Sequence, residues 1–202
     1  TINNYGTFNE ASYPLSHIIN AYLNPFSSNE INLQFSVTVI SFLVFIIFAL
    51  NIKKIFKNVK FIDIFLTSSI ILILPFFRTS AFWGLTENFG WIFLILSFYF
   101  FLQFKNKIYN EPNINEKINI IFFCFFCACG IYARQTLIFL PISYLLFLFF
   151  NKADKKVFIY SLACFSIFSI PGFFLIFNWG GLYDVSNNLS YTGGYFSYKN
   201  IL

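Results

Sequence analysis

Six long apolar stretches constrain the fold of this chain more than any other feature. They run over Leu33–Leu50, Phe61–Phe77, Phe89–Phe104, Ile118–Ala133, Thr136–Phe150 and Val157–Phe177. Each is continuously apolar rather than alternating, which argues against a β-barrel. Several are shorter than the roughly 20 residues that cross a bilayer core, so we expect their ends to extend into flanking interfacial residues such as Tyr, Trp and Asn. The pattern predicts an all-α bundle of about six transmembrane helices, forming a single domain over residues 1–202.

The composition excludes the main alternatives to a membrane protein. Hydrophobic residues make up 58% of the chain and charged residues only 10%, whereas soluble domains carry about a quarter charged residues. A soluble enzyme and a disordered chain are therefore both poor interpretations. The net charge of +5 does not indicate a nucleic-acid partner, because the basic residues lie between apolar stretches and not on one face. The expected partner is the lipid bilayer.

The lysines predict how the chain is oriented in the membrane. All but one of them fall in the first, third and fifth connections between stretches, namely Lys53, Lys54, Lys57, Lys60, Lys105, Lys107, Lys117, Lys152, Lys155 and Lys156. Positively charged loops remain in the cytoplasm. The non-cytoplasmic side then holds residues 1–32, 78–88 and 178–202. The abundance of Phe, Ile, Asn and Lys hints at an AT-rich genome, so we expect a bacterial inner membrane, with the functional side facing the periplasm or exterior.

The beginning of the sequence suggests a piece of a longer protein. Residue 1 is Thr, the chain contains no Met, and its first residues lack the pattern of a signal peptide. We therefore expect further residues before Thr1.

Both arginines stand at predicted non-cytoplasmic ends, where they depart from the distribution of the lysines. Arg134 lies between two stretches with almost no connecting loop, and Gln135 follows it. An arginine so close to the bilayer is costly unless it is paired or functional, and its planar fork suits phosphate or carboxylate. Arg78 ends the second stretch, and Glu87 begins the third. Glu87 is a candidate catalytic residue, but a helix-terminal carboxylate or an ion pair with Arg78 or Arg134 would explain it equally.

Three further residues on the same side are weaker candidates for substrate contact. His17 has no second histidine or cysteine at ligand spacing, so it does not indicate a metal site. Glu10 and Asp184 are loop carboxylates that would matter only if the fold placed them over the site.

The cysteines do not indicate a metal centre or a cofactor. Cys124, Cys127 and Cys129 lie within an apolar stretch, where thiolates would be expensive, so we interpret them and Cys164 as small buried apolar residues. No phosphate-binding loop, dinucleotide fingerprint or nucleophile elbow occurs, and no cofactor is expected.

Three segments resemble the GT-C superfamily of integral-membrane glycosyltransferases, and most of all its dolichyl-phosphate-glucose α-1,2-glucosyltransferase family. The segment Gly130-Ile131-Tyr132-Ala133-Arg134-Gln135-Thr136 is similar to that family's Arg-Gln-Thr motif at a luminal helix junction. Thr86-Glu87-Asn88 is similar to its Tyr-Thr-Glu entry to a helix, and Asn178-Trp179-Gly180-Gly181-Leu182 to its Asn-Gly-Gly stretch. Their order and approximate spacing also agree.

The resemblance implies transfer of a sugar from a polyprenyl- or dolichyl-phosphate donor to a glycan or lipid-linked acceptor. Arg134, with Gln135 and Arg78, would bind the phosphate, and His17, Glu10 and Asp184 would contact substrate. The family's acidic motif would lie before Thr1 and supply the main base. A transporter or flippase of lipid-linked saccharides, or a non-catalytic membrane subunit, is the alternative. It is disfavoured because a transporter places ionisable groups near mid-bilayer, and these stretches hold almost none.

Overall fold

The computed structural model describes residues 15–26, 29–56, 58–75, 77–79 and 87–179. Every regular element in these ranges is a helix, and none is a strand. The predicted all-α class is therefore confirmed over the described part of the chain.

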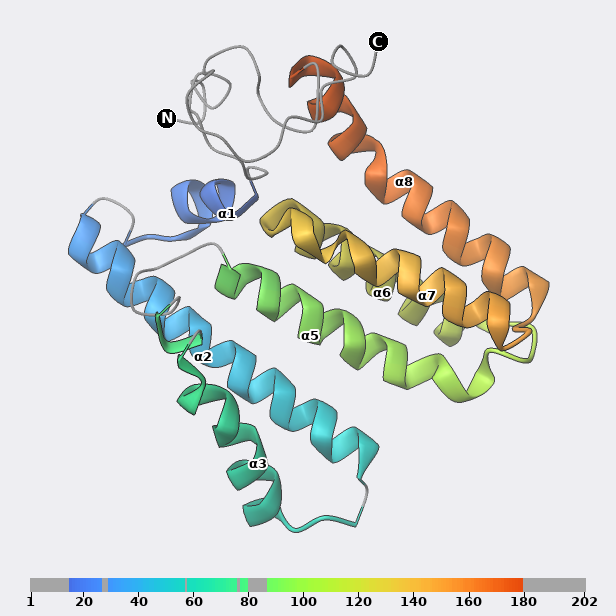
Figure 1. Cartoon of the computed structure of the whole chain (residues 1–202), viewed down its shortest axis with the longest axis horizontal. Helices are drawn as coiled ribbons and strands as arrows, with labels where there is room; N and C mark the ends of the chain where they lie inside the picture. Colours follow the sequence, from blue (N-terminus) through green and yellow to red (C-terminus); the bar gives the residue numbers. More distant parts are fainter. Residues whose placement is uncertain (1–14, 27–28, 57, 76, 80–86, 180–202) are drawn as a thin grey trace.

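The chain runs back and forth through a series of helices (Figure 1). Two short elements, α1 (Leu15–Ile18) and η2 (Ile19–Leu23), precede α2 (Glu30–Ile55) and α3 (Phe61–Ile73). There follow α5 (Glu87–Phe104), η3 (Lys105–Lys107), α6 (Ile114–Ala133), η4 (Gln135–Ile138), α7 (Phe139–Phe150) and α8 (Lys155–Trp179). The helix ends near residues 51–60, 104–117 and 150–156 are here called the lysine end. The opposite ends, near residues 15–36, 74–79, 87–91, 130–139 and 172–179, are called the arginine end.

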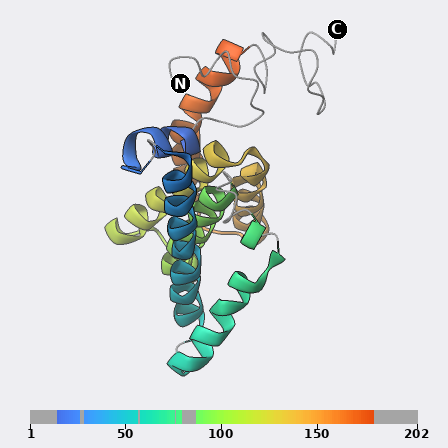
Figure 2. The same cartoon turned by 90° about the vertical axis from the view of Figure 1, so that its left-hand side faces the viewer.

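Helix α5 occupies the centre of the packing, because it has extensive interfaces with both α6 and α2. Helix α8 packs on α6, while α3 packs mainly on α2 and lies at the edge of the bundle (Figure 2). The largest buried cluster is aromatic and includes Phe104, Phe123, Tyr144 and Phe165. The cores thus lie between α5, α6, α7 and α8 and, separately, between α2 and α5.

Two buried asparagines join α2 to α5. The side-chain amide of Asn51 donates to the Ile95 carbonyl at 3.0 Å, and that of Asn88 donates to the Ser41 hydroxyl at 2.8 Å. Both asparagine side chains are almost fully buried. In lipid, where apolar contact supplies little driving force between helices, such interhelical hydrogen bonds contribute to association.

The outward faces of the helices are strongly apolar. Phe61 on α3 is 81% exposed, and Phe177 on α8 is 85% exposed. Apolar side chains also project from α2, including Phe35, Val39 and Phe42. An apolar surface this extensive is suited to a membrane or another protein surface and not to water.

Four helices are long and apolar enough to cross a membrane, namely Ile31–Ile55, Glu87–Lys107, Ile114–Ala133 and Lys155–Phe177. The other two predicted stretches are also helical but shorter, with 13 residues in α3 and 12 in α7. The second apolar stretch, Phe61–Phe77, is not one continuous helix, because α3 ends at Ile73 and residues 77–79 are helical again. Leu74, which precedes Pro75, adopts an extended ψ of 122°, because proline disfavours helical backbone in the residue before it.

Candidate functional site

Arg134 occupies a break between two helical segments. Helix α6 ends at Ala133, and Arg134 has extended backbone angles of φ −147° and ψ 107° before η4 begins at Gln135. Its N–H still bonds the Gly130 carbonyl at 2.7 Å, and its carbonyl accepts from Leu137 N–H at 3.0 Å. The break therefore loses little backbone hydrogen bonding, and it turns the chain at the arginine end of the bundle.

The guanidinium of Arg134 pairs with Glu87 across the bundle. Nη1 donates to Glu87 Oε1 at 2.6 Å, and the two side chains are 41% and 16% exposed. Glu87 begins α5, where a carboxylate also interacts favourably with the helix dipole. Of the two arginine partners that the sequence allowed for Glu87, the structure selects Arg134. The Arg134 side chain is partly exposed, so its guanidinium, which carries five N–H donors, can meet a second anion from outside.

Two glycines allow this pair to form at close range. A Cβ on Gly90 would lie 3.0 Å from Arg134 Cβ and 3.3 Å from Leu137 Cδ1. A Cβ on Gly130 would also lie 3.3 Å from Leu137 Cδ1. Leu137 thus packs closely against both glycine positions, between α5 and α6. Gly90 was not predicted as a site residue, although a glycine one turn after Glu87 indicates a close approach of another chain segment to α5.

An unpartnered amide lies next to the arginine. Nε2 of Gln135 is buried and has no hydrogen-bond partner within the described residues. A buried donor left without an acceptor costs about 1–3 kcal/mol, and a ligand oxygen would satisfy it. That Gln135 acts together with Arg134 stays a prediction.

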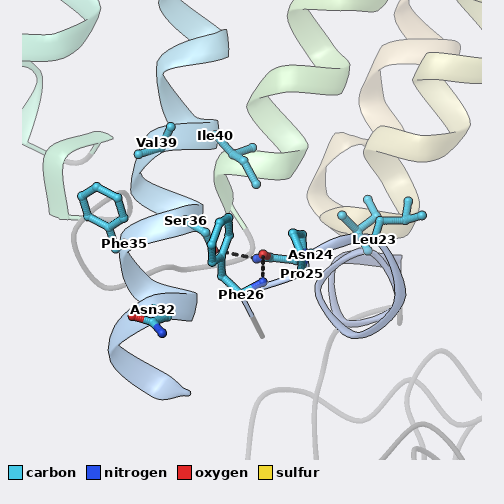
Figure 3. Close-up of a pocket in the computed structure, with 10 residues that line it drawn as sticks. Leu23, Asn24, Pro25, Phe26, Asn32, Phe35, Ser36, Val39 and Ile40 are labelled. Carbon is cyan, nitrogen blue, oxygen red and sulfur yellow. Dashed lines mark hydrogen bonds between the residues drawn. The ribbon is translucent and has the colours of Figure 1, made fainter. Parts of the chain in front are cut away.

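An apolar pocket opens at the arginine end, between the first short helices and α2 (Figure 3). Its volume is about 490 Å³, and its lining includes Ile19, Leu23, Phe26, Phe35, Val39 and Ile40. Ile19 and Ile40 also pack against the cluster of Val37, Phe89 and Ala133, which adjoin the helix ends that carry Glu87 and Arg134. The pocket and the ion pair therefore lie at the same end of the bundle, where this cluster packs against two of the pocket's lining residues.

Hydrogen bonds of the Asn24 side chain join the segment after the short helices to α2. The buried side chain of Asn24 donates to the Ser36 hydroxyl at 2.7 Å, and its Oδ1 accepts from Phe26 N–H at 3.0 Å (Figure 3). The Ser36 hydroxyl in turn donates to the Leu33 carbonyl. This pocket was not predicted from the sequence, because its lining residues come from two segments that meet only in the folded structure.

The remaining predicted site residues are not brought to the pair by the described structure. Arg78 is exposed in the helical residues 77–79, and its guanidinium bonds no described residue. His17 lies in α1 at the arginine end, and its side chain is outside the description. Glu10 and Asp184 lie outside the described residues.

The cysteines lie where the sequence predicts them. Cys124, Cys127 and Cys164 are buried, Cys129 is partly buried, and all four are free thiols. Among the described residues, no group of three or more His, Cys, Asp or Glu side chains could hold a metal ion.

The described fold therefore has the features of a helical membrane protein with a polar site at one end. No known protein family matches the chain, and no curated protein or solved structure was found to be similar to it.

Proposed function

We propose that the protein is a membrane glycosyltransferase that uses a polyprenyl- or dolichyl-phosphate sugar as donor. One observation carries the proposal: an arginine–glutamate pair with a partly exposed arginine side chain lies at the same end of the bundle as an apolar pocket. An amphiphile with an anionic phosphate and an apolar chain satisfies both features at once. The short segments that resemble GT-C enzymes include Glu87 and Arg134.

The chemistry assigns distinct tasks to these groups. In the transfer, the bond between the sugar's anomeric carbon and the phosphate oxygen breaks, and the acceptor oxygen bonds to that carbon. The phosphate leaves with an additional negative charge, which Arg134 stabilises together with the amide of Gln135. Glu87 holds the guanidinium in place. The acceptor hydroxyl loses its proton to a carboxylate, for which the resemblance expects an acid outside the described residues.

The expected setting is a bacterial inner membrane, with the arginine end facing the periplasm or exterior. The lysines of the opposite end agree with this orientation by the positive-inside rule. The acceptor would then be a glycan or a lipid-linked saccharide on the non-cytoplasmic face. In this setting we propose that all six apolar helices lie within the membrane in a GT-C-like arrangement.

The test uses the intact protein in proteoliposomes with a polyprenyl-phosphate sugar labelled in the sugar. We expect release of polyprenyl phosphate and movement of label to an acceptor, with a rate about 100-fold lower in Arg134→Ala. Lys107→Ala, a charge loss at the lysine end, serves as the matched control and should retain the rate. Translocation of the intact donor without cleavage would instead establish a transporter.

A further inference from the structure

Helix α8 contains a proline in its membrane-crossing part. Pro171 has no N–H, so the Ile167 carbonyl, four residues earlier, loses its helical donor. The following residue is Gly172, which adds backbone freedom at the same point. A defect of this kind persists in a membrane helix when a neighbouring helix supplies replacement hydrogen bonds.

The hydroxyl of Tyr132 on α6 bonds the backbone of α8 one residue beyond this carbonyl. It donates to the Phe168 carbonyl at 2.5 Å and accepts from the Gly172 N–H at 3.0 Å. Phe168 and Gly172 are four residues apart, so they are the carbonyl and N–H that pair with each other in a regular α-helix. The Tyr132 hydroxyl therefore bridges one rung of the α8 backbone, directly beside the proline.

The packing of the Tyr132 ring fixes this arrangement closely. A Cβ on Gly172 would lie 2.9 Å from Tyr132 Cε1 and 3.2 Å from its hydroxyl oxygen. Only glycine at this position lets the ring approach the backbone. Pro171, Gly172 and Tyr132 thus form one unit that joins the arginine ends of α6 and α8.

The same tyrosine stands two residues before Arg134. Between them lies Ala133, which is fully buried, so the last turn of α6 is held by α8 on one side through Tyr132. It is held by α5 on another side through the close approach of Gly90. The backbone break at Arg134 therefore directly follows a helix end that contacts both α8 and α5.

We propose that Tyr132 is a positioning residue for Arg134. Its hydroxyl bonds the α8 backbone beside Pro171, and this contact fixes the end of α6, so that the Arg134 side chain lies where it can pair with Glu87. The functional part rests on the proposed function, in which Arg134 binds phosphate. The structural part, a tyrosine hydroxyl that stabilises the defect in α8, does not depend on it.

The chain offers a matched control for removal of this hydroxyl. Tyr144 on α7 also bonds α8, where its hydroxyl lies 3.1 Å from the Ser161 hydroxyl in the aromatic core. Tyr132→Phe and Tyr144→Phe each remove one hydroxyl and keep the ring. Only Tyr132→Phe removes a bond to the backbone near Pro171.

The first measurement is hydrogen–deuterium exchange of α8 in the intact protein. We expect Tyr132→Phe to speed exchange around residues 168–176, because the Gly172 N–H loses its acceptor, while Tyr144→Phe leaves this region unchanged. Equal exchange in the two variants would overturn the structural part.

The second measurement is a double-mutant cycle on the binding of a C55 polyprenyl phosphate. We expect Tyr132→Phe to weaken binding by about 3- to 30-fold and to cause no further loss in the Arg134→Gln background, because it acts through the arginine. Additive losses would overturn the positioning role and leave only a structural one. If Arg134→Gln alone bound as tightly as the wild type, the phosphate role would fail, and the exchange result would still decide the structural part.

Discussion

The two ends of the bundle each contain a carboxylate at the start of a long helix, and the two carboxylates are bonded in different ways. At the lysine end, Glu116 in the first turn of α6 pairs with Lys107 at 2.7 Å. At the arginine end, Glu87 pairs with Arg134 at 2.6 Å. Both carboxylates are largely buried, with side-chain exposures of 8% and 16%.

Both carboxylate oxygens of Glu116 are bonded, one at the start of its own helix and one to Lys107. Its Oε2 accepts from the Asn113 N–H at 2.9 Å, and its N–H donates to the Asn113 side chain at 3.0 Å, which forms a capping box. With Oε1 on Lys107, both oxygens are bonded. Within the described residues, Glu87 has only one bonded oxygen, and its partner comes from a break between helices. The comparison indicates that the first carboxylate stabilises a helix start and that the second orients Arg134, the residue to which we assign phosphate binding.

The largest expected effect separates these two carboxylates in the transfer assay. Glu87→Gln should lower kcat/KM by about 10- to 100-fold, because the guanidinium loses the charge-assisted bond that orients it. Glu116→Gln should leave kcat/KM near the wild-type value. A comparable loss in both variants would show that the two pairs do not differ in role.

The next expected effect comes from the two glycines beside Leu137. Gly90→Ala places a Cβ 3.0 Å from Arg134 Cβ, so α5 and the Arg134 break must move apart, at a cost of about 1–3 kcal/mol of stability. Gly130→Ala meets only Leu137 at 3.3 Å and Phe93 at 3.7 Å, and it gains helix propensity. Thermal unfolding in detergent should therefore show a clear loss for Gly90→Ala and a small change for Gly130→Ala. The reverse order would contradict the close packing of Arg134 on α5.

At the lysine end, the expected effect is on stability and not on activity. Glu116→Ala removes one half of the capping box together with the Lys107 pair, and should cost about 1–2 kcal/mol of unfolding free energy. Denaturation of the solubilised protein measures this loss. A Glu116→Ala protein that kept its stability but lost activity would reverse the assignment of the two ends.

The smallest effect is expected from the exposed pair of the lysine end. Lys156 and Glu111 lie 2.7 Å apart with side-chain exposures of 65% and 64%. Pairs this exposed contribute about 0–1 kcal/mol. Glu111→Gln should therefore change neither stability nor activity beyond the error of the same assays, which makes it a control for the loss of one carboxylate charge.

Much of the helical framework could be predicted from sequence. The helical character of the apolar stretches and the position of Arg134 between two of them are both determined by the local sequence. The end of α3 at Ile73 was missed, although Leu74-Pro75 signals it, because the apolar pattern continues through the proline. For Glu87, the sequence supplied the two possible arginine partners, and only the packing of α5 on α6 selects Arg134.

Three features of the site depend on contacts that no local pattern carries. The hydrogen bond from Asn24 to Ser36, the packing of Leu137 against Gly90, and the bridge from Tyr132 to α8 each join residues at least 12 positions apart along the chain. Each contact depends on how two helices pack, so the sequence around either partner does not predict it.

The most direct test of the account is the affinity of the intact protein for a C55 polyprenyl phosphate, measured for the wild type, Arg134→Gln and Lys107→Gln. The account predicts that Arg134→Gln binds about 10- to 100-fold more weakly, since a charge-assisted bond to phosphate is lost, and that Lys107→Gln binds like the wild type. Wild-type affinity in Arg134→Gln, or an equal loss in both variants, would contradict a phosphate site at the arginine end.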